Sequence, residues 1–298
     1  MTAHTSAVAS DARAAADVKA ATPGVAAAEP PENSQAPKES SRVVIHCRDM
    51  HKFYLAGEQS VYALQDIDLE IREREFVSVV GKSGCGKSTL LHCIAGLLPV
   101  SHGEIAINGE RVQKPGRRDI GMVFQTSALL RWRTALENVL LPAEMFGLSR
   151  KDIEPRVREL LRLVDLQGFE KQYPNQLSGG MQQRVAIARA LVHDPSVLLM
   201  DEPFGALDAH TRENMNLELM RIWEATPKTV LFVTHDLQEA TFLSNRVVVM
   251  TAHPGTIQEI VEVPIPHPRT RDVLYTREFV RTVKHLRELL VSQRDGGR

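Results

Sequence analysis

The fold is decided by a glycine-rich octapeptide, Gly81-Lys82-Ser83-Gly84-Cys85-Gly86-Lys87-Ser88. It follows an apolar run at residues 76–80 and opens a stretch that is predicted to be helical, residues 88–95. The pattern G-x-x-x-x-G-K-[ST] between a strand and a helix is typical of a phosphate-binding loop. Glycine lets the backbone bring bare N–H groups against phosphate oxygens, and the helix N-terminus adds partial positive charge. We therefore predict a nucleotide-phosphate site here, the alternative being a glycine-rich turn that binds nothing.

Two side chains of this loop have specific chemistry. Lys87 would place a full positive charge at the β- and γ-phosphates of a nucleotide. The hydroxyl oxygen of Ser88 is a hard ligand of the kind that Mg²⁺ prefers. The loop therefore predicts a nucleoside triphosphate with its magnesium ion.

A second apolar run, residues 197–200, ends in two adjacent acids, Asp201 and Glu202. A nearly continuous apolar run indicates a strand that is covered on both faces. At its carboxyl end, Asp201 is placed to hold Mg²⁺ through water near Ser88, and Glu202 to orient or deprotonate the attacking water. The alternative is a pair of solvated acids that only cap the strand.

Polar residues also follow two other predicted strands. Gln125 follows residues 120–124, and His235 follows residues 230–234. The carboxyl ends of parallel strands line the ligand crevice of a doubly wound sheet. Both side chains are therefore expected within reach of a γ-phosphate or its water.

The rest of the chain alternates short apolar runs with helical patterns, which indicates an α/β fold. Predicted strands cover residues 43–46, 67–71, 76–80, 104–107, 120–124, 197–200, 230–234 and 247–250. Predicted helices cover residues 88–95, 135–146, 151–163, 179–192, 211–224, 237–243 and 277–290. The early strands alternate apolar and acidic residues, which predicts a half-exposed antiparallel sheet. Between Phe124 and Ser178 only helices are predicted, so this region reads as a helical insertion.

The composition argues against a nucleic-acid-binding, membrane-spanning or secreted protein. Of 298 residues, 43% are hydrophobic and 24% charged, and the net charge is −1, so nothing points to nucleic acid. There is no apolar stretch of about 18 residues and no secretory signal, which predicts a cytosolic chain with three reduced cysteines. Residues 1–42 are rich in alanine and lack leucine, isoleucine and aromatic residues, which predicts a disordered tail.

One further motif, Leu177-Ser178-Gly179-Gly180-Met181-Gln182-Gln183-Arg184, resembles the signature of ATP-binding cassette (ABC) proteins. Without the resemblance it would read as a helix start capped by Ser178. Met181 stands where glutamine is usual, a variant familiar in importers of the nitrate, taurine and alkanesulfonate type. The resemblance covers about residues 43–265 and implies a P-loop NTPase cassette. Its expected parts are a RecA-like parallel-sheet core, an antiparallel β subdomain, a helical subdomain at about residues 126–180 and a C-terminal helical extension, residues 266–298.

The resemblance also implies roles for individual residues and names ATP and Mg²⁺ as ligands. Tyr54 would stack on adenine, and Gly81 to Thr89 would be the P-loop. Gln125 would be the glutamine that senses Mg²⁺ and the transport partner, and His235 the switch histidine at the γ-phosphate. The remaining implied ATP contacts are Ser178, Gly179, Gly180 and Asp208.

The implied partners are a second copy of the cassette, integral membrane permease subunits and, indirectly, a periplasmic or lipoprotein solute-binding protein. In such pairs the signature of one cassette closes over the P-loop of the other, at the cytoplasmic face of the cell membrane. The groove for the permease would lie near residues 125–138. There Arg131 replaces the proline of the family's Leu-Leu-Pro-Trp segment.

Two other functions compete with an importer ATPase. A soluble ABC ATPase acting on DNA or the ribosome would resemble proteins with a long coiled coil or two cassettes, and neither feature is present. A P-loop kinase would not need Ser178 to Met181 or a histidine after the last core strand. The sequence therefore predicts the ATPase of a bacterial importer for a small anion, of the nitrate, taurine or aliphatic sulfonate type.

Overall fold

The computed structural model describes residues 42–56 and 59–292. Apart from Arg42, the predicted N-terminal tail lies outside the described residues. Among the residues that the structure describes, no helix has the length and apolar character needed to cross a bilayer.

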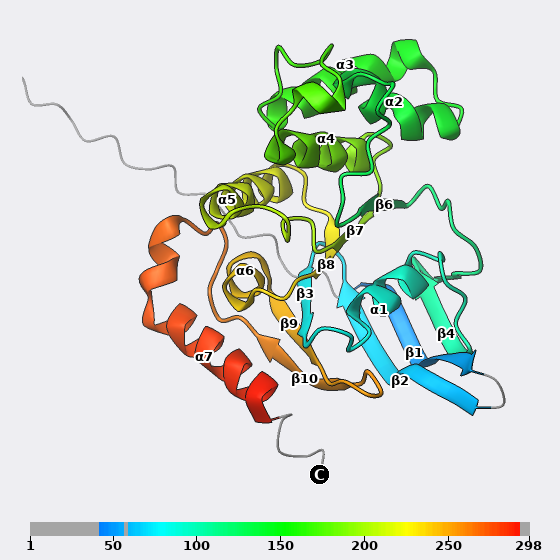
Figure 1. Cartoon of the computed structure of the whole chain (residues 1–298), viewed down its shortest axis with the longest axis vertical. Coiled ribbons are helices and arrows are strands. Elements are labelled where there is room, and N and C mark those ends of the chain that lie inside the picture. The colour runs from blue at the N-terminus through cyan, green and yellow to red at the C-terminus, as the bar shows by residue number, and fades with distance from the viewer. Residues whose placement is uncertain (1–41, 57–58, 293–298) are drawn as a thin grey trace, which may run out of the picture. The chain divides into compact units, whose positions relative to one another are not determined.

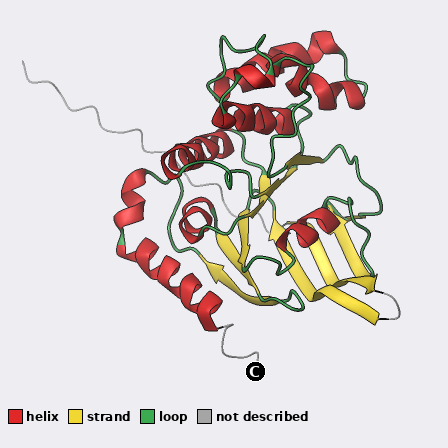
Figure 2. Cartoon of the chain, in the orientation of Figure 1, coloured by secondary structure: helices red, strands yellow, loops and turns green. Residues whose placement is uncertain are grey.

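The central sheet has six strands, in the order β10-β9-β3-β8-β7-β6 (Figures 1 and 2). Five of them run parallel, and β10 lies antiparallel to β9 at one edge. The strands are β3 (Phe76–Gly81), β6 (Ile120–Val123), β7 (Val197–Asp201), β8 (Thr229–Val233), β9 (Arg246–Met250) and β10 (Ile257–Glu262). Every residue of β3, β7 and β8 is buried, which confirms the reading of continuous apolar runs as strands covered on both faces.

A second sheet has four antiparallel strands, in the order β2-β1-β4-β5. They are β1 (Val43–Ala56), β2 (Gln59–Arg72), β4 (His102–Ile107) and β5 (Glu110–Arg111). In β2, Ile67, Leu69 and Ile71 are buried while Asp68 and Glu70 are exposed, as the alternation predicted. The predicted ranges for β1 and β2 were too short, because both strands continue into half-exposed stretches without a clear apolar pattern. β5 and β10 were not predicted.

All seven predicted helices are present, with ends within two residues of the prediction. They are α1 (Lys87–Ile94), α2 (Ala135–Met145), α3 (Arg150–Leu163), α4 (Gly179–Leu191), α5 (Ala209–Ala225), α6 (Leu237–Leu243) and α7 (Arg277–Ser292). Two short 3-10 turns precede α4 and α7, at Pro174–Gln176 and Arg271–Tyr275. Helices α2, α3 and α4 pack against one another, and Figure 1 shows them in green as a group above the central sheet. The division into domains at residues 126–180 and 266–298 stays a prediction.

Helix α1 is packed between the two sheets, which fixes the loop that precedes it. Its Leu90, Leu91 and Ile94 are fully buried. They share a hydrophobic cluster with apolar side chains of both sheets, among them Ile67 of β2 and Val79 of β3. Burial of such side chains stabilises the fold by roughly 1.5–3 kcal/mol each. The glycine-rich loop is thus anchored by β3 on one side and by this buried helix on the other.

Arg74 lies in the turn between β2 and β3 with a φ of 62°. This is the left-handed region of backbone conformation, where a Cβ costs about 1–2 kcal/mol. Because glycine also loses more chain entropy on folding, we expect Arg74→Gly to raise the free energy of unfolding by about 0.5–1 kcal/mol. Denaturant unfolding measures this. The matched control is Arg72→Gly, at a strand position with ordinary φ, which should lower the free energy of unfolding. An Arg74→Gly chain that is no more stable than the parent chain would contradict the strain argument.

Candidate nucleotide-binding site

A cleft of about 360 Å³ opens at the carboxyl ends of β3, β7 and β8. It is lined by Ala63, Ser83, Gly84, Gly86, Lys87, Ser88, Thr89, Glu202 and His235. The glycine-rich loop after β3 forms one wall, Glu202 follows β7, and His235 follows β8 by one residue. The two motifs that sequence reasoning singled out independently thus meet in one cleft.

The glycines of the loop have backbone conformations and close contacts that a side chain would not allow. Gly84 and Gly86 have φ of 78° and 98°. A Cβ on Gly86 would lie 2.7 Å from Cδ2 of Leu64 and 2.9 Å from the carbonyl oxygen of Ala63. Only glycine lets the loop pass β2 this closely and still turn its N–H groups toward a ligand.

Lys87 extends back across the loop. Its ammonium donates to the carbonyl oxygens of Gly81 and Lys82 at 3.0 and 3.2 Å. The side chain is buried, with 6% of the residue exposed. An ammonium held by carbonyl oxygens can exchange these acceptors for an anion in the cleft.

Ser88 and Asp201 form a pair of oxygen ligands. The Ser88 hydroxyl donates to Oδ1 of Asp201 at 2.9 Å, so the predicted proximity of the two is confirmed. Oδ2 of the same carboxylate lies 3.6 Å from Nε2 of His92, a residue of α1 that sequence reasoning missed. One hydroxyl and one carboxylate are the donor set that Mg²⁺ takes beside phosphate oxygens. The residues present therefore fit a magnesium ion.

Glu202 and His235 lie in hydrogen-bond contact, with 3.1 Å between Oε2 and Nδ1. Glu202 has a φ of 42° and its N–H donates to the carbonyl oxygen of Val233, so the strained backbone is held by the neighbouring strand. A sparsely populated backbone conformation persists only where its surroundings fix it, and such positions cluster at functional sites. The carboxylate and the imidazole face the same cleft and can act on the same water.

Several other predicted site residues lie outside the set that lines this cleft. Gln125 follows β6 and is exposed. Tyr54, on β1, is 45% exposed, and its ring is covered by Nζ of Lys52 at 5.0 Å. Asp208 is the N-cap of α5 and accepts from the N–H of Thr211 at 3.0 Å. Hydrogen bonds from Thr211 hold the pKa of this carboxyl below its usual range.

The signature residues Ser178, Gly179 and Gly180 begin helix α4 and also lie outside the cleft lining. Ser178 is the N-cap, since its hydroxyl accepts from the N–H of Met181 at 3.3 Å. The next glycines leave the helix N-terminus bare, and such an end is a ready anion site. This helix end is therefore separate from the cleft of its own chain.

Helix α4 is tied to the segment that follows Gln125, a connection that sequence reasoning missed. Arg189 donates to the carbonyl oxygens of Ser127 and Ala128 at 2.7 and 2.8 Å. The Ser127 hydroxyl donates to the side-chain oxygen of Gln182 at 3.2 Å. Burial of Arg189 lowers the pKa of its guanidinium, and its two carbonyl partners replace the lost water. A shift of the α4 N-terminus would therefore move the loop after Gln125.

Cys85 lies in the loop, but its thiol does not face the cleft. The residue is 1% exposed, and its Sγ lies 2.5 Å from where a Cβ on Gly81 would stand. Burial raises the pKa of the thiol. Because the thiol is covered and protonated, its alkylation should be slow with or without ligand.

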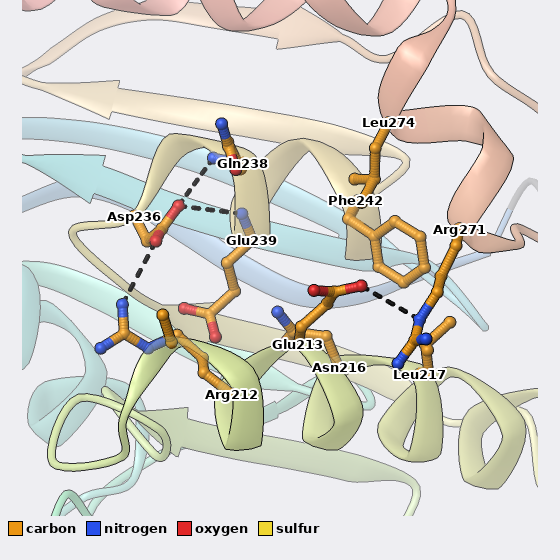
Figure 3. Close-up of a pocket in the computed structure, with 11 residues that line it drawn as sticks. Arg212, Glu213, Asn216, Leu217, Asp236, Gln238, Glu239, Phe242, Arg271 and Leu274 are labelled. Carbon is orange, nitrogen blue, oxygen red and sulfur yellow. Dashed lines mark hydrogen bonds and ion pairs between the residues drawn. The ribbon is translucent and has the colours of Figure 1, made fainter.

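A second cavity, of about 210 Å³, lies between α5, α6 and the 3-10 turn at Arg271–Tyr275, and it is lined by Asp236, the residue after His235 (Figure 3). Asp236 caps α6 and also pairs with Arg212 of α5 at 3.3 Å. Glu239 of α6 accepts from the hydroxyl of Thr234, and its other oxygen is buried without a hydrogen-bond partner among the described residues. The cavity thus holds a buried carboxyl next to the segment that carries His235.

Burial raises the pKa of Glu239 to about 7, and the nearby acids Asp236 and Glu202 add to the shift, while the Thr234 hydrogen bond opposes it. Because the folded-state pKa lies above the unfolded value, this group's stabilising contribution is complete below about pH 4.5 and is lost as the pH rises through about 7. We expect Glu239→Gln, which mimics the protonated form, to remove about 2 kcal/mol of the pH dependence between about pH 5.5 and pH 8.5.

Denaturant unfolding at pH 5.5 and 8.5 measures this effect. The variant should gain stability over the parent chain at the higher pH. Glu288→Gln, on the exposed face of α7, is the control and should leave the pH dependence unchanged. An unaltered slope in Glu239→Gln would show that the carboxyl is ionised in the folded state.

Comparison with known proteins agrees with this geometry. Residues 64–205 match the ABC transporter family. The chain is 46% identical to the aliphatic sulfonates import ATP-binding protein SsuB of Bacillus cereus, over 77% of this chain and 90% of that protein. It is 50% identical to the taurine import ATP-binding protein TauB of Rhizobium johnstonii, over 67% of this chain and 76% of that protein.

Solved structures show the same fold. A dimeric ATP-binding cassette in a post-hydrolysis state, bound to ADP and Pi, superposes with a TM-score of 0.65 at 38% identity, covering 73% of this chain and 98% of that one. The cassette cbiO1 of Clostridium perfringens, part of an ABC transporter complex, gives a TM-score of 0.67 at 25% identity and covers 85% and 100%. The P-loop cleft, the α/β core and these relatives together show that the chain belongs to the ATP-binding subunits, the ATPases, of ABC transporters.

Proposed function

We propose that this chain hydrolyses MgATP in the cleft between its P-loop, Glu202 and His235, and that the reaction drives import of a sulfonate-type anion. The observation that carries the proposal is the convergence of three elements on one cleft of about 360 Å³. They are the buried ammonium of Lys87, the Ser88–Asp201 pair and the Glu202–His235 pair. Each supplies one requirement of phosphoryl transfer to water.

Each of these residues would have its own role in the reaction. Lys87 leaves its two carbonyl partners and neutralises oxygens of the β- and γ-phosphates. Ser88 and Asp201 would hold Mg²⁺, which would offset negative charge on the same phosphates. Glu202 orients a water molecule and accepts its proton as the water oxygen bonds to the γ-phosphorus and the bond to ADP breaks. His235 fixes the Glu202 carboxylate and contacts the γ-phosphate.

The site is completed by a second copy of the chain. Ser178, Gly179 and Gly180 begin a bare helix outside the cleft of their own chain, so they are free to meet the γ-phosphate bound by a partner. Asp208 would lie at the same dimer junction and Tyr54 against adenine, while Gln125 would reach the metal. The dimeric form of a solved relative supports this arrangement.

Movement of the cassettes on dimer closure would be transmitted to the permease subunits through α4. Because Arg189 and Gln182 tie this helix to Ser127 and Ala128, movement of the signature displaces the loop beside Gln125. The chain would therefore sit at the cytoplasmic face of the membrane against permease subunits, with a solute-binding protein on the far side. The names of the relatives favour taurine or an aliphatic sulfonate as the solute over nitrate.

Growth and uptake by the source organism lacking this chain tests the proposal. Taurine, an alkanesulfonate and nitrate would be offered in turn as sole sulfur or nitrogen source. Loss of uptake of one sulfonate, restored by the intact chain but not by Lys87→Ala, is the expected result. Unimpaired uptake of all three solutes would contradict the proposed substrate class.

A further inference from the structure

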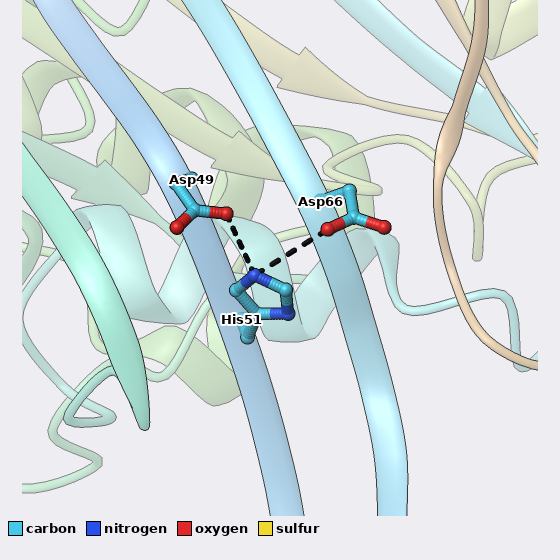
Figure 4. A group of neighbouring side chains, drawn as sticks. All are labelled: Asp49, His51 and Asp66. Carbon is cyan, nitrogen blue, oxygen red and sulfur yellow. Dashed lines mark hydrogen bonds and ion pairs between the residues drawn. The ribbon is translucent and has the colours of Figure 1, made fainter.

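A cluster of two histidines and two aspartates lies on the antiparallel sheet, on elements separate from the P-loop. Asp49 and His51 belong to β1, Asp66 to β2, and His102 is the first residue of β4. Figure 4 shows the His51 ring between the carboxylates of Asp49 and Asp66, with one nitrogen directed at both. The cluster therefore joins three neighbouring strands.

An irregularity in β1 brings the cluster together. The pairing of β1 with β4 shifts register between Arg48, opposite Glu104, and His51, opposite His102. A β-bulge of this kind re-aims side chains on the bulged strand. The partner position is Gly103, where a Cβ would stand only 2.0 Å from the carbonyl oxygen of Asp49. The absence of a side chain at Gly103 allows β4 to lie close to β1, which places His102 beside Asp49.

Three of these side chains, Asp49, His51 and Asp66, bring ligand atoms close enough to share one ion, and the metal-free cluster is held by a hydrogen bond between His51 and Asp49. Nε2 of His51 lies 2.8 Å from Oδ1 of Asp49 and 3.5 Å from Oδ1 of Asp66. Nε2 of His102 lies 3.3 Å from Oδ2 of Asp49. The ligand atoms of Asp49, His51 and Asp66 all fall within 4.8 Å of one another. With metal–ligand bonds of about 2.0–2.2 Å, neighbouring ligands of a tetrahedral ion are about 3.3–3.5 Å apart.

We propose that Asp49, His51 and Asp66 bind one divalent transition-metal ion of the zinc class, with water completing its coordination and His102 holding the Asp49 carboxylate from behind. One imidazole and two carboxylates match the ligand preference of Zn²⁺, and the two negative charges balance the ion. Mg²⁺ and Ca²⁺ fit less well because they require more oxygen ligands than the cluster offers.

Access and anchoring both suit a bound ion. The His51 side chain is only 15% exposed, which fixes its ring, whereas Asp66 and His102 are 64% and 68% exposed. An ion can therefore enter from solvent without unfolding the sheet. Once bound, it would clamp β1, β2 and β4 together three residues before Tyr54, and would stabilise the chain without acting in ATP chemistry.

Titration of the full, nucleotide-free chain with Zn²⁺, and with Co²⁺ as a spectroscopic probe, tests the proposal. We expect one equivalent of Co²⁺ to bind with the absorption of a tetrahedral N/O site, to be displaced by Zn²⁺, and to be unaffected by excess Mg²⁺. His51→Ala and the surface variant His102→Gln should each weaken binding at least about tenfold. The matched control is His46→Ala, which removes a histidine from the same strand whose Nε2 lies 3.5 Å from Glu70.

The surface variant keeps the test independent of folding, because His102 is mostly exposed and its replacement should leave the metal-free melting temperature unchanged. Binding that survives both His51→Ala and His102→Gln would overturn the proposal. So would a thiolate charge-transfer band with Co²⁺, since it would place the ion at a cysteine, or the absence of binding near one equivalent.

Discussion

Glu202→Gln is expected to slow ATP hydrolysis by about 10²-fold or more while ATP binding persists. The amide keeps the size of the carboxylate and can still contact His235, but it cannot accept a proton from water. With hydrolysis blocked, ATP should stay between two chains and hold them as a dimer. Phosphate release measures the first effect, and sedimentation with ATP measures the second.

Glu288→Gln is the matched control, because it makes the same chemical change on the exposed face of α7. It should hydrolyse ATP at the rate of the parent chain. Two results would count against Glu202 as the base: parental turnover in Glu202→Gln, or an ATP-loaded variant that sediments only as a monomer. The second would argue against the composite site in particular.

Lys87→Ala should abolish turnover and weaken nucleotide binding, because it removes the positive charge at the β- and γ-phosphates. Lys87 is the only lysine or arginine among the described residues that line the cleft. A hydrogen bond to a charged group is worth about 1.5–3 kcal/mol, so ATP affinity should fall at least about tenfold. Binding of a fluorescent ATP analogue, with phosphate release measured in parallel, gives both quantities.

The control for this variant is Lys284→Ala, which removes an exposed lysine from α7. Its affinity and turnover should match those of the parent chain. Because the Lys87 ammonium also bridges the carbonyls of Gly81 and Lys82, the melting temperature of the variant must be compared as well. A folded Lys87→Ala chain that binds and hydrolyses ATP normally would refute the role of the P-loop.

The core of the site was predictable because its signals are local. A buried strand reads as an apolar run, and the glycines, Lys87 and Ser88 follow such a run directly in the sequence. The same holds for Asp201 and Glu202 after β7. Since parallel strands end at one edge of a sheet, sequence order alone was enough to bring these groups together.

Features that depend on strand register or on distant packing were not predictable. His92 reaches Asp201 from the second turn of α1, and Arg189 reaches Ser127 across many intervening residues. The histidine–aspartate cluster of the antiparallel sheet depends on a bulge in β1 and on Gly103 opposite to it. A single sequence carries no pairing register, so none of these contacts leaves a recognisable spacing.

The most direct test of the account is the rate of phosphate release from MgATP by the purified chain, measured over a range of chain concentrations. A composite site predicts activity that requires Mg²⁺, disappears in Glu202→Gln and rises per chain as the concentration increases, because each site needs two chains. Activity per chain that stays constant on dilution would contradict the two-chain site. Transfer of the phosphate to an acceptor other than water would contradict the ATPase itself.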